Sequence, residues 1–198
     1  MYDLIWGAAF VLAVSFLSNV FPFFGASYTL LAALQITLLG STPYNFAVIV
    51  LVSALGATLA KAVIYFGGLG FRKPLLKNRN VRLIEKYSRT NGFFLVLFVA
   101  ALLPVFPFDD FIFIGAGAAL ASLGAMLLVT LAAKVIKSTV EVAIELAILK
   151  GLATVFDFHR LDITIALSAV FVVIGIMVYK VDWEAVYGRL TGRPLPQV

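Results

Sequence analysis

The chain has 198 residues, of which 63% are hydrophobic and 13% carry a charge, with a mean hydropathy of +1.07 and a formal net charge of +5. A water-soluble domain of this size has too little interior to bury so much apolar surface, and disorder requires low hydropathy and high charge. The composition therefore excludes a soluble enzyme and a disordered chain, and it predicts one integral membrane domain over 1–198. Because cysteine is absent and histidine occurs once, thiolate and histidine-rich metal sites are excluded, and we expect no cofactor.

The first predicted element, residues 1–43, is an apolar hairpin. Residues 4–39 are apolar throughout but are interrupted at 18–25, where Pro22 and Gly25 stand. Because proline stops or kinks a helix, two arms of roughly 11 to 14 residues remain, each long enough to cross about half of the bilayer core. Two such arms predict a re-entrant hairpin that enters and leaves the membrane on one side, with its tip covered by protein or water.

A transmembrane helix is predicted next over 44–70, followed by a basic segment over 71–91. The basic segment holds seven Lys or Arg residues against one acid, which predicts a cytoplasmic position. One face of a short amphipathic helix is indicated by the spacing of Leu76, Asn80, Leu83 and Tyr87. Two roles stay open for this segment: a helix lying on the anionic cytoplasmic leaflet, and positive-inside charge without a specific lipid role.

The second half of the chain repeats this order of elements. Residues 92–124 form a second predicted re-entrant hairpin, broken at Pro104 and Pro107, and a transmembrane helix follows over 125–150. Short sequences also recur. Val-Phe-Pro-Phe at 20–23 is found again at 105–108. Thr-Leu-Ala precedes a lysine in both predicted transmembrane helices. Together, the repeated order of elements and the recurring short sequences indicate an internal repeat.

The positive-inside rule sets the topology of these elements. The span 44–70 runs from outside to inside, and the span 125–150 returns outward, so hairpin plus span occurs twice with opposite topology. An apolar span over 163–180 leads to a cytoplasmic tail over 181–198, and the N-terminus lies outside. The predicted fold class is an all-α integral protein of the plasma membrane, with two inverted repeats of re-entrant hairpin plus transmembrane helix, and a C-terminal transmembrane helix.

Charged side chains inside this apolar sequence define the candidate site. A charge at bilayer depth costs at least ~2.5 to 3.5 kcal/mol, so it normally faces a cavity or a partner. The basic group would bind a substrate head group and comprises Lys61, Lys134 and Lys137. The acidic group would serve proton coupling and comprises Asp109, Asp110 and Glu141. The predicted span over 125–150 carries four charged residues that are three, four and four positions apart, which places them on one stripe of a helix: Lys134, Lys137, Glu141 and Glu145.

Each of these charges also has a structural interpretation. Lys137 and Glu141 are spaced for an i, i+4 ion pair that neutralises both. The Lys134 side chain is long enough to snorkel toward the cytoplasmic end of its span. Lys61 is a candidate partner for Asp109 or Asp110, in an ion pair that would connect the two repeats. The adjacent aspartates repel each other, which favours a proton on one of them, but a helix cap explains their position equally well. Glycines in the spans allow close packing or hinges, and we expect packing at Gly56.

Three motifs, in this order, resemble those of the DedA family, also called the SNARE-associated or VTT-domain family. Residues 56–70, which end in Tyr-Phe-Gly-Gly-Leu-Gly, resemble the family's Gly, Tyr and Gly-x-x-Gly signature. Residues 86–92, with Lys-Tyr and then Asn-Gly, resemble its lysine-tyrosine-glycine motif before the second hairpin. Residues 103–117, with two prolines and Gly-Ala-Gly, resemble its proline-rich hairpin followed by Ala-Gly. The resemblance covers about residues 15–150.

This resemblance implies two facing re-entrant hairpins in inverted repeats. It also implies phospholipid scrambling or translocation of a polyprenyl-phosphate carrier, with proton coupling proposed in bacteria. The chain departs from the family because it lacks glutamates near the first break and arginines around the second. The family's phosphate-binding arginines are therefore not carried over. The ionisable groups left at the tips are Asp109 and Asp110, and the cations available to a phosphate are Lys61, Lys134 and Lys137.

We therefore expect a transporter or scramblase that moves a lipid or lipid-linked phosphate by alternating exposure of a cavity between the hairpins. Its partners would be membrane lipids, either phospholipid or polyprenyl phosphate, together with protons, and assembly into a homo-oligomer stays open. The alternatives are an ion or small-solute secondary transporter on the same scaffold and a non-transporting membrane scaffold protein. An enzyme is not expected, because no nucleophile with a base is visible, and neither is nucleic-acid binding.

Overall fold

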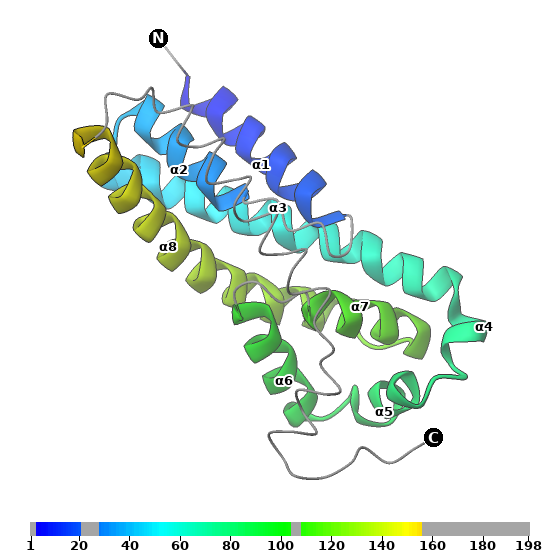
Figure 1. Ribbon diagram of the computed structural model, residues 1–198. Coiled ribbons are helices and arrows are strands. Elements are labelled where there is room, and N and C mark those ends of the chain that lie inside the picture. Colours follow the sequence, from blue (N-terminus) through cyan, green and yellow to red (C-terminus); the bar gives the residue numbers. More distant parts are fainter. Residues whose placement is uncertain (1–2, 21–27, 104–107, 156–198) are drawn as a thin grey trace.

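The computed structural model describes residues 3–20, 28–103 and 108–155, and the statements below concern these residues. All of their regular secondary structure is helical, which confirms the predicted all-α class (Figure 1). The predicted span over 163–180 and the tail over 181–198 lie outside the described residues. The four predicted break residues also lie outside them: Pro22, Gly25, Pro104 and Pro107.

Helices α1 (Leu4–Val20) and α2 (Tyr28–Leu39) are the two arms of the first apolar region. α2 has 12 residues, within the expected range, whereas α1 has 17 and continues through the start of the expected interruption. The reason is local: a proline excludes only the residue before it from helical geometry, and Pro22 stands two positions after the last residue of α1.

Helix α3 (Pro43–Gly70) begins at a well-formed N-terminus. The Thr42 hydroxyl accepts a hydrogen bond from the Asn45 backbone N–H at 3.1 Å, and proline occupies the first helical position, where no intrahelical N–H is needed. Gly40, with a φ of +91°, makes the tight turn from α2. The 28 residues of α3 extend about 42 Å, which exceeds the ~30 Å thickness of a bilayer core.

The basic segment forms two short helices, α4 (Arg72–Leu75) and α5 (Arg79–Tyr87), where one was predicted. The chain breaks between them because the Asn78 side chain accepts a backbone N–H at 2.8 Å and caps α5. Leu76 therefore lies outside the helix that carries Tyr87, and the predicted single face is wrong. The face of α5 that packs on the rest of the chain instead carries Val81 and Ile84.

The second half comprises α6 (Asn91–Leu102), α7 (Phe108–Ala119) and α8 (Leu123–Val155). α7 begins at Phe108, directly after Pro107, the second of the two prolines at which the sequence predicts the break. Asp109 and Asp110 thus occupy the first turn of a helix, where the helix dipole stabilises negative charge.

The turn from α7 to α8 uses a left-handed residue that is not glycine. Leu120 has a φ of +58°, and the Ala121 N–H donates to the Ala116 carbonyl at 3.0 Å, which closes the C-terminus of α7. The Tyr65 hydroxyl of α3 donates to the Ala121 carbonyl at 2.7 Å and holds this turn against α3. The turn is therefore fixed by contacts from both halves of the chain.

The two long helices connect the halves. α3 contacts α1 and α2 of its own half and also α7, and α8 contacts α6 of its own half and also α2 (Figure 1). Close approach of α3 and α7 depends on glycine. A Cβ atom on Gly68 would stand 2.0 Å from the Ile114 carbonyl oxygen, and one on Gly117 would stand 2.0 Å from the Tyr65 carbonyl oxygen. A Cβ atom on Gly56 would stand 2.6 Å from the Leu12 carbonyl oxygen of α1, which confirms the predicted packing role.

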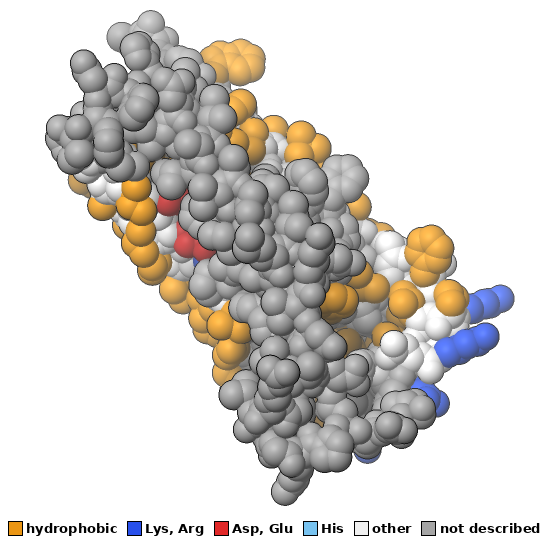
Figure 2. Space-filling model, in the orientation of Figure 1, with side chains coloured by type: hydrophobic (Ala, Val, Ile, Leu, Met, Phe, Trp, Pro, Cys, Tyr) orange, Lys and Arg blue, Asp and Glu red, His pale blue; other side chains and the backbone are white. Residues whose placement is uncertain are grey.

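The outward faces of the long helices are apolar, whereas charged side chains lie inside. Large side chains are exposed at helical spacing on α3, at Leu51, Leu55, Leu59, Val63 and Phe66, and on α8, at Ile136, Val140, Ile144 and Ile148. Figure 2 shows hydrophobic side chains along the edge of the molecule that α8 forms. Two helical segments, Pro43–Gly70 and Leu123–Leu149, are long and apolar enough to cross a membrane, and they indicate membrane association.

Candidate functional site

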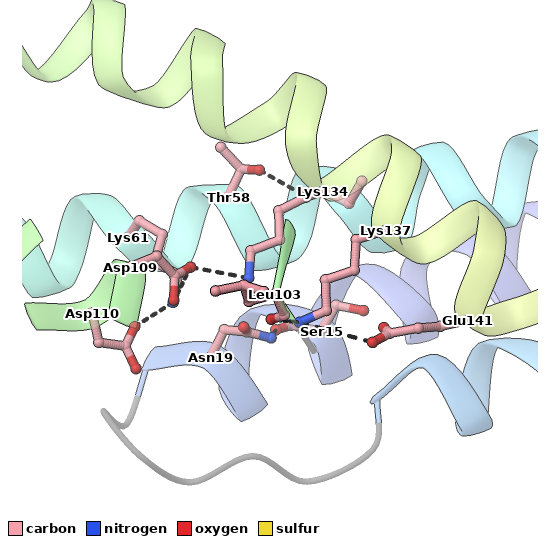
Figure 3. A network of polar contacts seen from close by, with 11 residues as sticks. Ser15, Asn19, Thr58, Lys61, Leu103, Asp109, Asp110, Lys134, Lys137 and Glu141 are labelled. Atoms are coloured by element: carbon pink, nitrogen blue, oxygen red, sulfur yellow. Dashed lines mark hydrogen bonds and ion pairs between the residues drawn. The ribbon is translucent and has the colours of Figure 1, made fainter. Parts of the chain in front are cut away.

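Four charged side chains from three helices meet in the interior. The Lys61 ammonium of α3 lies 3.1 Å from Asp109 Oδ2 and also binds Asp110 Oδ1, both in the first turn of α7. The Lys134 ammonium of α8 lies 3.0 Å from the same Asp109 oxygen (Figure 3). Two ammonium groups and two carboxylates thus form one neutral cluster, named the ion cluster below.

The ion cluster is almost completely shielded from solvent. The exposed fractions are 2% for Lys61, 3% for Asp109, 5% for Asp110 and 3% for Lys134. Lys134 therefore does not snorkel to an end of its helix. The expected repulsion between the two aspartates is offset by the two ammonium groups, so the pair does not by itself require a proton. Transferring an unpaired ion to such an interior costs several kcal/mol, which explains why every charge has an opposite neighbour.

A second ion pair lies one turn further along α8. Lys137 Nζ is 3.8 Å from Glu141 Oε1, as the i, i+4 spacing predicted, and it donates to the Leu103 carbonyl at 3.3 Å, just after α6 ends. The side chains of this pair are 14% and 27% exposed, so it is more accessible than the ion cluster. A long, partly solvated ion pair contributes little stability and separates easily.

The charged stripe on α8 reaches a third helix at its last member. Glu145 Oε1 accepts a hydrogen bond at 2.9 Å from the Thr29 hydroxyl of α2. The stripe on α8 therefore contacts three other helices: α7 through Lys134, the end of α6 through Lys137, and α2 through Glu145. The stripe that the residue spacing indicated faces the interior along its length.

Further buried polar groups lie beside this stripe. The buried Tyr28 hydroxyl of α2 lies close to the Ser138 hydroxyl of α8. Among the described residues, Thr130 Oγ1 on α8 and Gln35 Nε2 on α2, near Gly7 of α1, are buried without a hydrogen-bond partner. Buried polar atoms normally have a partner, so this interior is suited to a polar guest. The sequence gives no signal for these residues, because isolated polar side chains in apolar helices form no pattern.

Of the six predicted ionisable site residues, four form the buried ion cluster and two form the adjoining, partly exposed pair. Within the described part of the chain, no group of three or more His, Cys, Asp or Glu side chains is placed to hold a metal ion. Comparisons with protein-family models, curated proteins and solved structures find no match to this chain. Chemically, the ammonium groups are able to exchange a carboxylate for another anion, and the carboxylates are able to accept protons.

Proposed function

We propose that this protein is a DedA-like membrane transporter or scramblase that moves a lipid or lipid-linked phosphate across the bilayer. The observation that carries the proposal is the ion cluster, which joins α3, α7 and α8 inside a molecule whose long helices are apolar outside. Charged groups at membrane depth typically line substrate or ion pathways. A cluster that only held helices together would gain little over well-packed apolar side chains, because desolvation offsets the ionic attraction.

In the proposed mechanism the phosphate of the substrate competes with the aspartates for the lysines. Lys137, whose pair with Glu141 is long and partly exposed, makes the first contact. The phosphate then reaches Lys61 and Lys134 as their bonds to Asp109 open. A proton taken up by Asp109 weakens both of these bonds at once and couples proton entry to phosphate binding. The first turn of α7 is thus the moving element.

The proposed architecture consists of two inverted repeats of re-entrant hairpin plus transmembrane helix. It is supported by reciprocal contacts, because α7 packs on α3 of the other half and α2 packs on α8 of the other half. The arms α2 and α7 both have 12 residues and extend about 18 Å, roughly half of a bilayer. The basic α4 and α5 lie on the cytoplasmic side of the plasma membrane in this proposal, and the N-terminus lies outside.

The test is lipid flip in proteoliposomes that contain the full chain. A fluorescent phospholipid is scored by its accessibility to an external quencher, and a polyprenyl phosphate is scored in parallel. The variant Lys61→Met with Asp110→Asn keeps the cluster neutral but removes one ammonium group, and we expect the rate to fall about tenfold. The matched control is Lys77→Met, on an exposed lysine outside the cluster, which should keep the wild-type rate.

Each other outcome separates the alternatives. A rate that depends on an imposed pH gradient would support proton coupling. Flux of an inorganic ion or small solute without any flip would favour the secondary transporter. The absence of every flux from protein that is demonstrably folded and inserted would overturn the transport proposal and leave the membrane scaffold.

A further inference from the structure

An open pocket lies where α3 ends and α4 begins. Its volume is about 570 Å³, and its wall includes Leu69, Phe71, Arg72 and Lys73. Because α3 is long enough to cross a membrane, the residues directly after it are expected at a membrane surface. Figure 2 shows Lys and Arg side chains protruding at the end of the molecule where Figure 1 places α4.

Arg72 is one of the side chains that line this pocket. Its Nε atom is buried and has no hydrogen-bond partner among the described residues, and none of them forms an ion pair with it. Lys61 and Lys134, by contrast, already bind aspartates. A guanidinium group presents a planar fork of donors that matches two oxygens of a phosphate. Arg72 lines the pocket and has no carboxylate partner among the described residues, so its guanidinium group is available to an oxyanion.

The surroundings of Arg72 favour an amphiphilic anion. Between 71 and 91 the chain has seven basic residues and one acidic residue, so the local field attracts negative charge. Phe71 is 69% exposed at the rim of the pocket, which places an aromatic ring beside the basic side chains. Aromatic rings at such positions normally sit at the headgroup level of a bilayer. Gly70 leaves the wall open, because a Cβ atom there would meet nothing within 4 Å.

We propose that this pocket binds the phosphate group of an anionic phospholipid at the membrane surface. Arg72 holds two phosphate oxygens, Lys73 supplies a second positive charge, and Phe71 contacts the glycerol and upper acyl region. The site is separate from the ion cluster and does not depend on transport. It would anchor the end of α3 to the leaflet and fix the depth of the helix.

The test measures retention of phosphatidylglycerol by the full chain in nanodiscs of phosphatidylcholine with a minor fraction of phosphatidylglycerol, by native mass spectrometry. Arg72→Gln should weaken retention about tenfold, as expected for the loss of a charge-assisted contact. Arg82→Gln removes the same charge from an exposed position outside the pocket and should change retention less than twofold. Equal losses in both variants would show general surface attraction and would overturn the proposal.

Two further measurements distinguish the pocket from its charge and the lipid from a free ion. Gly70→Leu fills the pocket without altering charge and should also weaken retention, whereas Gly67→Leu, which is in open space but outside the pocket wall, should not. Inorganic phosphate should fail to displace the lipid at millimolar concentration. Displacement by inorganic phosphate would show a site for the free anion and would overturn the lipid assignment.

Discussion

Lys134 on α8 lies 3.0 Å from Asp109 Oδ2 on α7, and the same oxygen lies 3.1 Å from Lys61 on α3. One carboxylate oxygen therefore joins the long helices of both halves. Asp109 also stands in the first turn of its helix, where the backbone favours negative charge. A change at this one group alters the connection of α7 to both long helices at once.

Removing one ammonium group from the ion cluster should destabilise the protein strongly. Lys61→Met leaves two buried carboxylates facing one lysine, so we expect a loss of about 3 to 5 kcal/mol in unfolding free energy. Adding Asp110→Asn restores neutrality and should recover much of this loss. Unfolding in mixed detergent, followed by circular dichroism, measures both. Equal stability of the single and double variants would contradict the charge balance described for the cluster.

The contact between α3 and α7 should tolerate no side chain at its glycines. Gly68→Ala would place a methyl group 2.0 Å from a backbone carbonyl oxygen, so α7 must move away, and we expect a large loss of thermal stability. The neighbouring Gly67 is the matched control, because a Cβ atom there meets nothing within 4 Å. Gly67→Ala should be neutral or stabilise the helix by up to about 1 kcal/mol. Thermal melting of the two variants in one detergent distinguishes them.

The turn after α7 offers a stabilising substitution. Leu120 has a left-handed φ of +58°, which costs a residue with a Cβ atom roughly 1 to 2 kcal/mol. Leu120→Gly relieves this cost and should raise the melting temperature. Gly40→Ala, at a φ of +91°, imposes the same kind of cost and should lower it. If both changes shifted the melting temperature in one direction, these two turn conformations would be wrong.

The hydrogen bond from Thr29 to Glu145 should be energetically significant, since it is buried and has a carboxylate acceptor. Thr29→Val keeps the shape of the side chain but removes the donor, and we expect a loss of about 1.5 to 3 kcal/mol. Thr139→Val is the control, because that hydroxyl is exposed and bonds only to its own helix, to the Val135 carbonyl. Chemical unfolding of the two variants gives the comparison.

Composition and residue spacing determined the all-helical class, the two long apolar helices and the face of α8 that carries its charges. These features depend on the composition and the residue spacing of single segments. A 3.6-residue period places Lys134, Lys137, Glu141 and Glu145 on one stripe in any helix, and the free energy of burying charge requires that stripe to face inward. The helix boundaries do not follow from residue spacing, since capping by Asn78 and the start of α7 depend on a few backbone contacts.

Residue spacing indicated the Lys137–Glu141 pair and left a Lys61–aspartate pair open, but only the tertiary structure placed Lys61 and Lys134 on the same Asp109 oxygen. Lys61 is 48 residues from Asp109, and no sequence period relates α3 to α7, so their pairing depends on how closely the two backbones approach. That approach is set by Gly68 and Gly117, where each helix presses on the other's backbone. The partnership of Thr29 with Glu145 and the pocket at Arg72 likewise arise where separate helices end or cross. Such contacts are a property of the packed chain, because their free energy depends on distances that no single segment contains.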